Sequence, residues 1–102
     1  MTYKIAGVYD FEGPFISPLS LREESGVYVV LDLRSEGYHM LDAGQSENVK
    51  EQVKTSAFKD SWEKNRKGTL HYAAWYGEEA ARVKMEKIIR DNYSAPCWEE
   101  WE

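Results

Sequence analysis

The clearest pattern along the chain is the alternation of apolar and polar residues between positions 26 and 43. Gly26–Leu33 (GVYVVLDL) is rich in β-branched residues, and its successive side chains would lie on opposite faces of a strand. Residues 34–37 (RSEG) have the composition of a turn, and Tyr38–Ala43 has the pattern of a second strand. These segments predict an antiparallel hairpin. A third strand is predicted at Thr69–Tyr76 (TLHYAAWY).

Helical spacing follows the hairpin. Apolar residues recur at every fourth position from Val49 to Ala57, which predicts the buried stripe of a helix that begins after an N-cap at Ser46. Asp60 can cap a further short helix. The longest helix is predicted from about Glu78 to Asn92, and Pro96 prevents its continuation.

The order of these elements is hairpin, helices, strand and long helix, which predicts an α+β fold. The simplest layered arrangement is a small three-stranded antiparallel sheet with helices flanking it. We divide the chain into an N-terminal extension that packs on the domain (residues 1–25), the domain itself (residues 26–97) and an acidic, Trp-rich tail (residues 98–102).

Composition and charge narrow the classes of function. The chain has 102 residues, a single cysteine and a net charge of −5. One cysteine excludes an internal disulfide, and no signal peptide or membrane span is apparent, so we predict a cytoplasmic protein without a membrane partner. The net charge opposes binding of the whole surface to nucleic acid. Residues 50–67, however, contain six cations and three anions, a local charge of +3.

Few residues of this chain suit the common catalytic chemistries. His39 and His71 both lie in predicted strands without the spacing of metal ligands, and no phosphate-binding glycine loop is present. Three features remain: the triplet Gly26-Val27-Tyr28, the turn Asp42-Ala43-Gly44 with the polar residues after it, and Glu86 in the last helix.

In their order and spacing, these three features resemble the motifs of the GIY-YIG nuclease superfamily, over about residues 26–97. The resemblance implies a magnesium-dependent phosphodiesterase site on one face of a three-stranded sheet. It also implies roles for four groups: a tyrosine that activates water, a second tyrosine that assists it, an arginine that stabilises the phosphate, and a glutamate that holds Mg²⁺ or Mn²⁺. Such chemistry is physically sound, because a divalent cation and an arginine neutralise the charge of the transition state.

The resemblance is incomplete at the residues that would perform the chemistry. Tyr28 stands at the position of the first tyrosine and Glu86 at that of the metal ligand. Asp42 replaces the second tyrosine, and Gln52 stands where the arginine is expected, eight residues after Gly44. Glutamine has no positive charge, and charge-assisted hydrogen bonds to phosphate are roughly twice as strong as neutral ones. An ion-pair ladder from Glu86 to the arginines four residues before and after it would explain Glu86 without a metal.

The sequence therefore leads to one hypothesis and two alternatives. The first is a nuclease-like protein with impaired catalysis that binds nucleic acid through four cations: Lys50, Lys54, Arg66 and Arg82. The second is an active Mg²⁺-dependent DNA endonuclease in which Lys50, Arg66 or Arg82 replaces the missing arginine. The third is a protein-interaction module without a nucleic-acid role, which the acidic, Trp-rich tail favours. The sequence leaves the oligomeric state open.

Overall fold

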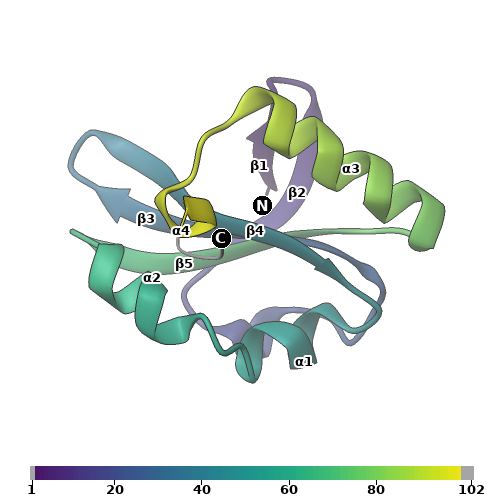
Figure 1. The fold of residues 1–102 in the computed structure, drawn as a ribbon, viewed down its shortest axis with the longest axis horizontal. Helices are drawn as coiled ribbons and strands as arrows, with labels where there is room; N and C mark the ends of the chain where they lie inside the picture. The colour runs from purple at the N-terminus through teal and green to yellow at the C-terminus, as the bar shows by residue number, and fades with distance from the viewer. Residues whose placement is uncertain (1, 100–102) are drawn as a thin grey trace.

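The computed structural model describes residues 2–99, and these residues form an antiparallel sheet flanked by helices (Figure 1). The five strands follow the order β1-β2-β5-β3-β4 across the sheet. Their bounds are β1 Thr2–Ile5, β2 Tyr9–Phe15, β3 Gly26–Arg34, β4 Gly37–Ser46 and β5 Thr69–Tyr76. The α+β class is as predicted, and so are the hairpin, here β3 and β4, and the third strand, here β5.

The prediction of a three-stranded sheet is wrong, because the N-terminal residues add two strands to it. β2 pairs with β5, and β1 pairs with β2. The pattern hid β2 because Gly13 and Pro14 lie inside it, where both residues normally signal a loop. The structure accommodates them at a shift of register between Glu12 and Phe15, the kind of irregularity at which proline is tolerated in a sheet.

The sheet curls into a half-barrel. Its edge strands β1 and β4 are separated by three other strands, yet the rings of Tyr3 and Tyr38 meet edge to face with their centroids 5.6 Å apart. Strand twist accumulates across a sheet in this way. The curl leaves the outer edge of β4 open along the side of the molecule.

Helices cover both faces of the sheet. On one face, α3 (Glu79–Asn92) buries Met85 and Ile89 against alternate residues of β3, including Val27. On the other face, α1 (Val49–Lys54) and α2 (Lys59–Asn65) pack in one apolar cluster with the intervening residues of β3. The predicted alternation of the two faces of β3 is confirmed. A 3-10 turn, η1 (Pro18–Ser20), lies beside α1.

Helix α1 begins later than the sequence predicts. β4 continues through Ser46, and Asn48 is the N-cap, with its side chain accepting a hydrogen bond from the N–H of Glu51. Ser46 instead accepts a hydrogen bond from the N–H of Asn48, which shapes the short connection. The helix ends at Lys54, so Ala57 lies beyond it and is exposed.

A β-bulge in β4 determines where Asp42 points. Val30 of β3 pairs with Asp42, whereas the next residue, Leu31, pairs with Met40. Leu41 is therefore the extra residue of the bulge, and both it and Asp42 lie on the α1–α2 face. Without the bulge, the register would be shifted by one residue on one side of Leu41, and the side chains there would point to the opposite face of the sheet.

The far end of the hairpin carries a second buried carboxylate, Asp32. It accepts hydrogen bonds from the backbone N–H groups of Lys67 and Gly68, both at 2.8 Å, and pairs with Arg34 at 2.7 Å. These bonds fix the turn that leads from α2 into β5.

The C-terminal segment passes along the outer edge of β4. After α3, the chain leads to α4 (Pro96–Glu99), which packs on β4 and α2 (Figure 1). Cys97 is buried on the α1–α2 face, whereas Trp98 packs against the cluster on the α3 face. The segment thus covers part of an edge that is otherwise unpaired. Of the predicted acidic tail, residues 100–102 lie outside the described part of the chain.

Candidate functional site

Tyr28 is buried at the start of β3, and its hydroxyl reaches across to β4. The partner of Tyr28 in the ladder is Gly44. A Cβ atom at Gly44 would lie 2.5 Å from the Tyr28 hydroxyl oxygen, so no larger residue fits there unless the phenol moves. Glycine at position 44 therefore makes room for the Tyr28 side chain. Gly44 does not end the strand, because β4 continues to Ser46.

Asp42 lies two residues before Gly44 and is fully buried. One carboxylate oxygen accepts a hydrogen bond from Trp62 Nε1 at 2.6 Å, and the other accepts one from the N–H of Ala43 at 2.8 Å. Burial raises the pKa of Asp42 to about 6, although the Trp62 and Ala43 N–H groups and the charge of Arg90 act in the opposite direction. Asp42 is thus a carboxylate that changes protonation close to neutral pH.

Gln52 is exposed on α1, and its side chain lies close enough to Tyr28 to influence the phenol. Burial and the negative charges of Asp42 and Glu86 raise the pKa of Tyr28 well above its usual value, whereas Arg90 and the Gln52 side chain act in the opposite direction. Tyr28 therefore stays protonated at every physiological pH. Its hydroxyl acts as a hydrogen-bonding group rather than as a base.

Helix α3 contributes a chain of charged and polar contacts above the same end of β4. The Glu86 carboxylate accepts a hydrogen bond from Gln45 Nε2 at 3.1 Å and pairs with Arg90 at 3.8 Å. Arg82 donates from Nε to Gln45 Oε1 at 3.0 Å and from Nη1 to Ser25 Oγ at 2.7 Å. The amide of Gln45 is thus held between Glu86 and Arg82.

These contacts form one group that we call the β4 cluster. Its members are Tyr28, Asp42, Gln45, Gln52, Glu86 and Arg90. Tyr28 and Asp42 lie on the face of the sheet that α1 and α2 cover, and Gln52 comes from α1. Glu86 belongs to α3 on the other face, and its negative charge acts on the Tyr28 hydroxyl without a direct contact between the two side chains. Sequence reasoning missed Gln45 and Arg90 as members. Their signals were present, since Gln45 follows Gly44 and Arg90 stands four residues after Glu86.

The four predicted nucleic-acid-binding cations lie at different distances from the β4 cluster. Lys50 and Lys54 flank Gln52 on α1. Arg82 belongs to the chain of contacts above β4, but its side chain is only 11% exposed. Arg66 bonds to Glu63 and to the carbonyl of Gly68, near the far end of β3. That end is five residues from Tyr28, roughly 17 Å at the usual rise of a strand.

The donor groups of the β4 cluster do not fit a catalytic magnesium ion. Mg²⁺ requires oxygen ligands in an octahedral arrangement. Both oxygens of Asp42 already accept N–H donors, and Glu86 faces an amide N–H and a guanidinium. Among residues 2–99, no three His, Cys, Asp or Glu side chains lie together in a way that could hold a metal ion. The assignment of Glu86 as a metal ligand is therefore not supported by its surroundings.

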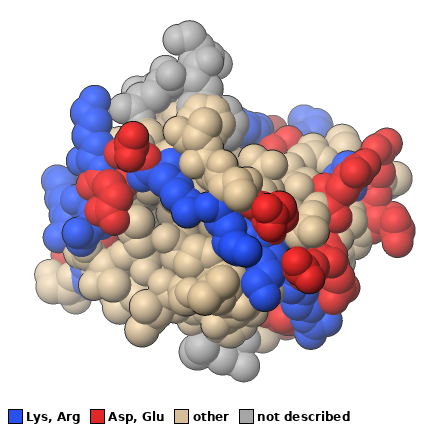
Figure 2. Space-filling model, turned by 90° about the horizontal axis from the view of Figure 1, so that it is seen from below, with Lys and Arg blue, Asp and Glu red and all other residues tan. Residues whose placement is uncertain are grey.

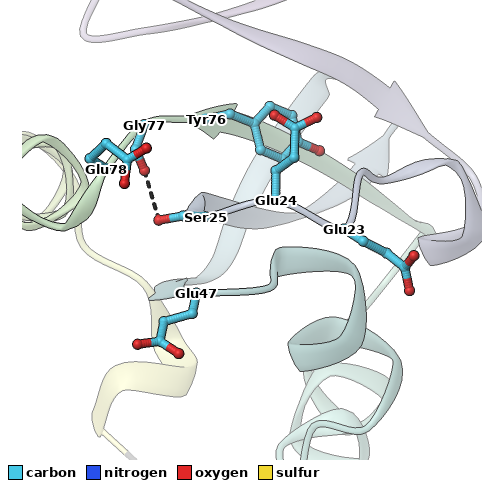
Figure 3. Close-up of a pocket in the computed structure, with 7 residues that line it drawn as sticks. All are labelled: Glu23, Glu24, Ser25, Glu47, Tyr76, Gly77 and Glu78. Carbon is cyan, nitrogen blue, oxygen red and sulfur yellow. Dashed lines mark hydrogen bonds between the residues drawn. The ribbon is translucent and has the colours of Figure 1, made fainter.

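A pocket of about 350 Å³ lies next to Arg82 and is strongly acidic (Figure 3). Its walls come from the residues that precede β3, follow β4 and follow β5. They include four glutamates, and Ser25 at its edge bonds to the carbonyl of Gly77: the lining is Glu23, Glu24, Ser25, Glu47, Tyr76, Gly77 and Glu78. Because four carboxylates repel a phosphate, a nucleic-acid backbone would not enter this pocket.

Trp98 covers the Asp42 side of the β4 cluster. Its ring lies over Arg90, with the guanidinium carbon 4.7 Å from the ring centroid. The indole N–H lies close enough to Asp42 to lower its pKa. It does not reach hydrogen-bond geometry, however, and Nε1 is buried without a partner in the described part of the chain.

Comparison with protein-family models, curated proteins and solved structures finds no match to this chain. The resemblance to the GIY-YIG nucleases therefore rests on the motifs in the sequence alone. In residues 2–99, no helix combines the length and the apolar character needed to cross a bilayer.

Proposed function

We propose that this chain is a small cytoplasmic protein of the GIY-YIG nuclease type that binds nucleic acid and has lost efficient cleavage. The observation that carries the proposal is the convergence of Tyr28, Asp42, Gln52 and Glu86. They are spread over 59 positions of the sequence, yet Asp42, Gln52 and Glu86 all influence the pKa of the Tyr28 hydroxyl. A purely structural origin of the motifs would not require these three polar side chains to act on one hydroxyl.

The chemistry of the β4 cluster argues against efficient cleavage. The position of the expected arginine holds the neutral Gln52. Losing one preorganised transition-state donor typically costs on the order of 10²–10³ in rate. Burial also raises the pKa of Tyr28 and so further disfavours its phenolate form, and Glu86 is engaged by Gln45 and Arg90.

Binding is supported by the distribution of positive charge. Figure 2 views the side of the molecule on which α1 and α2 lie and shows a diagonal band of Lys and Arg across largely uncharged surface. Lys50 and Lys54 are four residues apart on α1, so they lie on the same side of that helix as neighbours. Each is two residues from Gln52 and therefore points roughly 200° away from it around the helix, so these cations offer phosphate contacts on the side of α1 opposite Gln52.

The experiment incubates the purified full chain with supercoiled plasmid and Mg²⁺ or Mn²⁺, and in parallel titrates a fluorescent DNA at increasing salt. We expect no nicking above the level of a Glu86→Ala variant, together with binding that weakens as salt rises, because counterion release requires this. Nicking that Glu86→Ala abolishes would contradict the loss of cleavage. The absence of salt-dependent binding would contradict the nucleic-acid role and favour a protein partner.

A second candidate is an active endonuclease with a displaced arginine, and one observation favours it. Arg90 lies close enough to Tyr28 and Asp42 for its charge to lower the pKa of both groups. Arg82 is more remote and is held by Gln45 and Ser25, and Arg66 lies toward the other end of the sheet. If plasmid is nicked, this candidate expects Arg90→Gln to reduce the rate far more than Arg66→Gln does.

A further inference from the structure

The indole of Trp98 fits its surroundings incompletely. It stacks on the guanidinium of Arg90, as a planar aromatic ring does in a cation–π contact. Its N–H is turned toward the Asp42 carboxylate but is buried without a hydrogen-bond partner among the described residues. Buried indole N–H groups normally find an acceptor. The surroundings of Trp98 thus offer a guanidinium that stacks on a flat ring and a carboxylate acceptor that the indole N–H uses only in part.

The segment that carries Trp98 lies against the sheet from outside. In the sequence, this segment follows all five strands and α3. Its helix α4 packs on β4 and α2. Its anchor on the α2 side is Cys97, whose sulfur accepts from Ser61 Oγ at 3.3 Å and from Asn65 Nδ2 at 3.7 Å. Sulfur is a weak acceptor. No strand order or helix face depends on Trp98, so its removal leaves the sheet itself complete.

The chemistry of Arg90 and Asp42, which lie beneath Trp98, indicates the kind of ligand that could bind there. The guanidinium of Arg90 stacks on a flat π-system, and the carboxylate of Asp42 accepts hydrogen bonds from N–H groups at the edge of that system. Guanine is a flat ring that carries two such donors side by side, so a nucleobase of this kind matches both groups. A phosphate is disfavoured at this point, because Asp42 and Glu86 both lie close to it.

We infer that Trp98 occupies the place of an unpaired nucleobase, and that the C-terminal segment 96–99 is an intramolecular cover which a single strand displaces. The inference rests on the proposed nucleic-acid function. It adds that an unpaired base is the part of the ligand that is recognised, and that segment 96–99 blocks the site for this base. The base would stack on Arg90 and donate to Asp42, while the phosphates of the strand would run past Lys50 and Lys54 on α1.

The test measures the affinity of the full chain for a fluorescent single-stranded oligonucleotide and for an abasic strand with the same number of phosphates. We expect Trp98→Ala to bind the base-bearing strand roughly tenfold more tightly than wild type, since a contact between a guanidinium and a flat ring is worth about 0.5–2 kcal/mol. The abasic strand should show no gain. Trp98→Phe is the matched control: it keeps a ring over Arg90 and should remain close to wild type.

Two results would overturn the inference: an equal gain for the abasic strand, or no gain in a folded variant. If Trp98→Ala loses the native circular dichroism spectrum, Trp98→Leu, which keeps apolar bulk, replaces it. If that variant also unfolds, the indole N–H resonance of wild-type Trp98 decides. A shift on addition of the base-bearing strand alone supports the inference, and an unchanged resonance contradicts it.

The outcome for wild type separates this inference from the proposed function. Salt-dependent binding by wild type without a gain in the variants would leave the function standing and remove the cover. If the variants bind the base-bearing strand and wild type shows no measurable binding, segment 96–99 acts as a cover, and the protein with this cover in place does not bind nucleic acid.

Discussion

The two ends of the β3–β4 hairpin each bury a carboxylate completely, and the protein treats the two groups in opposite ways. Asp32 is paired with Arg34 and with two backbone N–H groups; burial raises its pKa, but these partners outweigh burial and hold the pKa below its usual value. Asp42 has no cation bonded to it, and burial raises its pKa to about 6. A buried carboxylate that is paired with a cation supports the fold, whereas one that only neutral N–H groups bond has the character of a functional group.

The largest effect on stability is expected from a substitution at Asp32, the end of the hairpin where the carboxylate is fully paired. Asp32→Ala leaves the Arg34 guanidinium and the N–H groups of Lys67 and Gly68 without their acceptor. We expect the free energy of unfolding to fall by about 3–5 kcal/mol, the usual result of removing one partner from a buried ion pair. Urea denaturation of wild type and variant measures the change. A loss below about 1 kcal/mol would show that Asp32 does not hold the turn into β5.

The next largest effect is expected at Asp42, where a substitution should raise the free energy of unfolding by an amount that depends on pH. Because the folded protein holds the Asp42 proton up to about pH 6 while the unfolded chain releases it near 3.8, the contribution of Asp42 to stability decreases as pH rises between these values. Two pKa units correspond to about 3 kcal/mol. We therefore expect Asp42→Asn to stabilise the protein by up to this amount at pH 7 and to have little effect at pH 4.

Asp32 supplies the matched control for that titration. Its pKa is lowered in the folded protein, so its contribution is present above the unfolded value and is lost as pH falls through the folded one. Asp32→Asn should therefore remove part of the stability lost on acidification, and the difference between this variant and wild type should shrink as pH falls. Denaturation at pH 3 to 8 measures both variants. Parallel pH profiles would contradict the difference between the two ends.

A smaller effect is expected where Tyr28 crosses Gly44. The methyl group of Gly44→Ala would meet the phenol at 2.5 Å and push it away from Gln52. Overpacking of this kind costs about 1–3 kcal/mol. Tyr28→Phe removes the closest atom, so the Gly44→Ala cost should be smaller in the Tyr28→Phe background. An equal cost in both backgrounds would show that the hydroxyl is not what excludes a side chain at Gly44.

The smallest effect on stability is expected at the rim of the β4 cluster. Lys54 is exposed and lies 3.9 Å from Glu51, so Lys54→Gln should change the free energy of unfolding by no more than about 0.5 kcal/mol. If Lys54 contacts phosphate, the same change should weaken DNA binding and reduce the salt slope by about 1. Arg66→Gln, at the other end of the sheet, is the matched comparison. A larger effect of Arg66→Gln on binding would move the nucleic acid to that end.

The sequence predicted the parts of the fold that have a strong local pattern. β3, β5 and α3 have clear periodicity, and their observed bounds differ from the predicted ones by no more than one residue. β2 was missed because its local composition, with Gly13 and Pro14, favours a loop, and only pairing with β5 makes it a strand. The start of α1 was misplaced because Ser46 and Asn48 are both good caps, and the continuation of β4 decides between them.

The candidate site was predictable only in part. The motifs identified Tyr28, Asp42, Gln52 and Glu86, and in the structure the last three influence the pKa of Tyr28. No local pattern shows that Leu41 forms a bulge, or that Trp62 and Trp98 both turn toward Asp42. The bulge arises from the pairing of β3 with β4, and the two tryptophans reach Asp42 from segments 20 or more residues away along the chain. They determine the protonation of Asp42, which the sequence alone does not reveal.

The most direct test of the account is to map a bound nucleic acid onto the two ends of the sheet. The measurement follows backbone and side-chain NMR signals of the isotope-labelled full chain as single-stranded DNA is added. We predict that the signals that move belong to Gln52, Glu86, Arg90 and Trp98, while those of Lys67 and Gly68 beside Asp32 stay in place. Movement centred on Lys67 and Gly68, or no movement at saturating DNA, would contradict the assignment of the β4 cluster as the functional end.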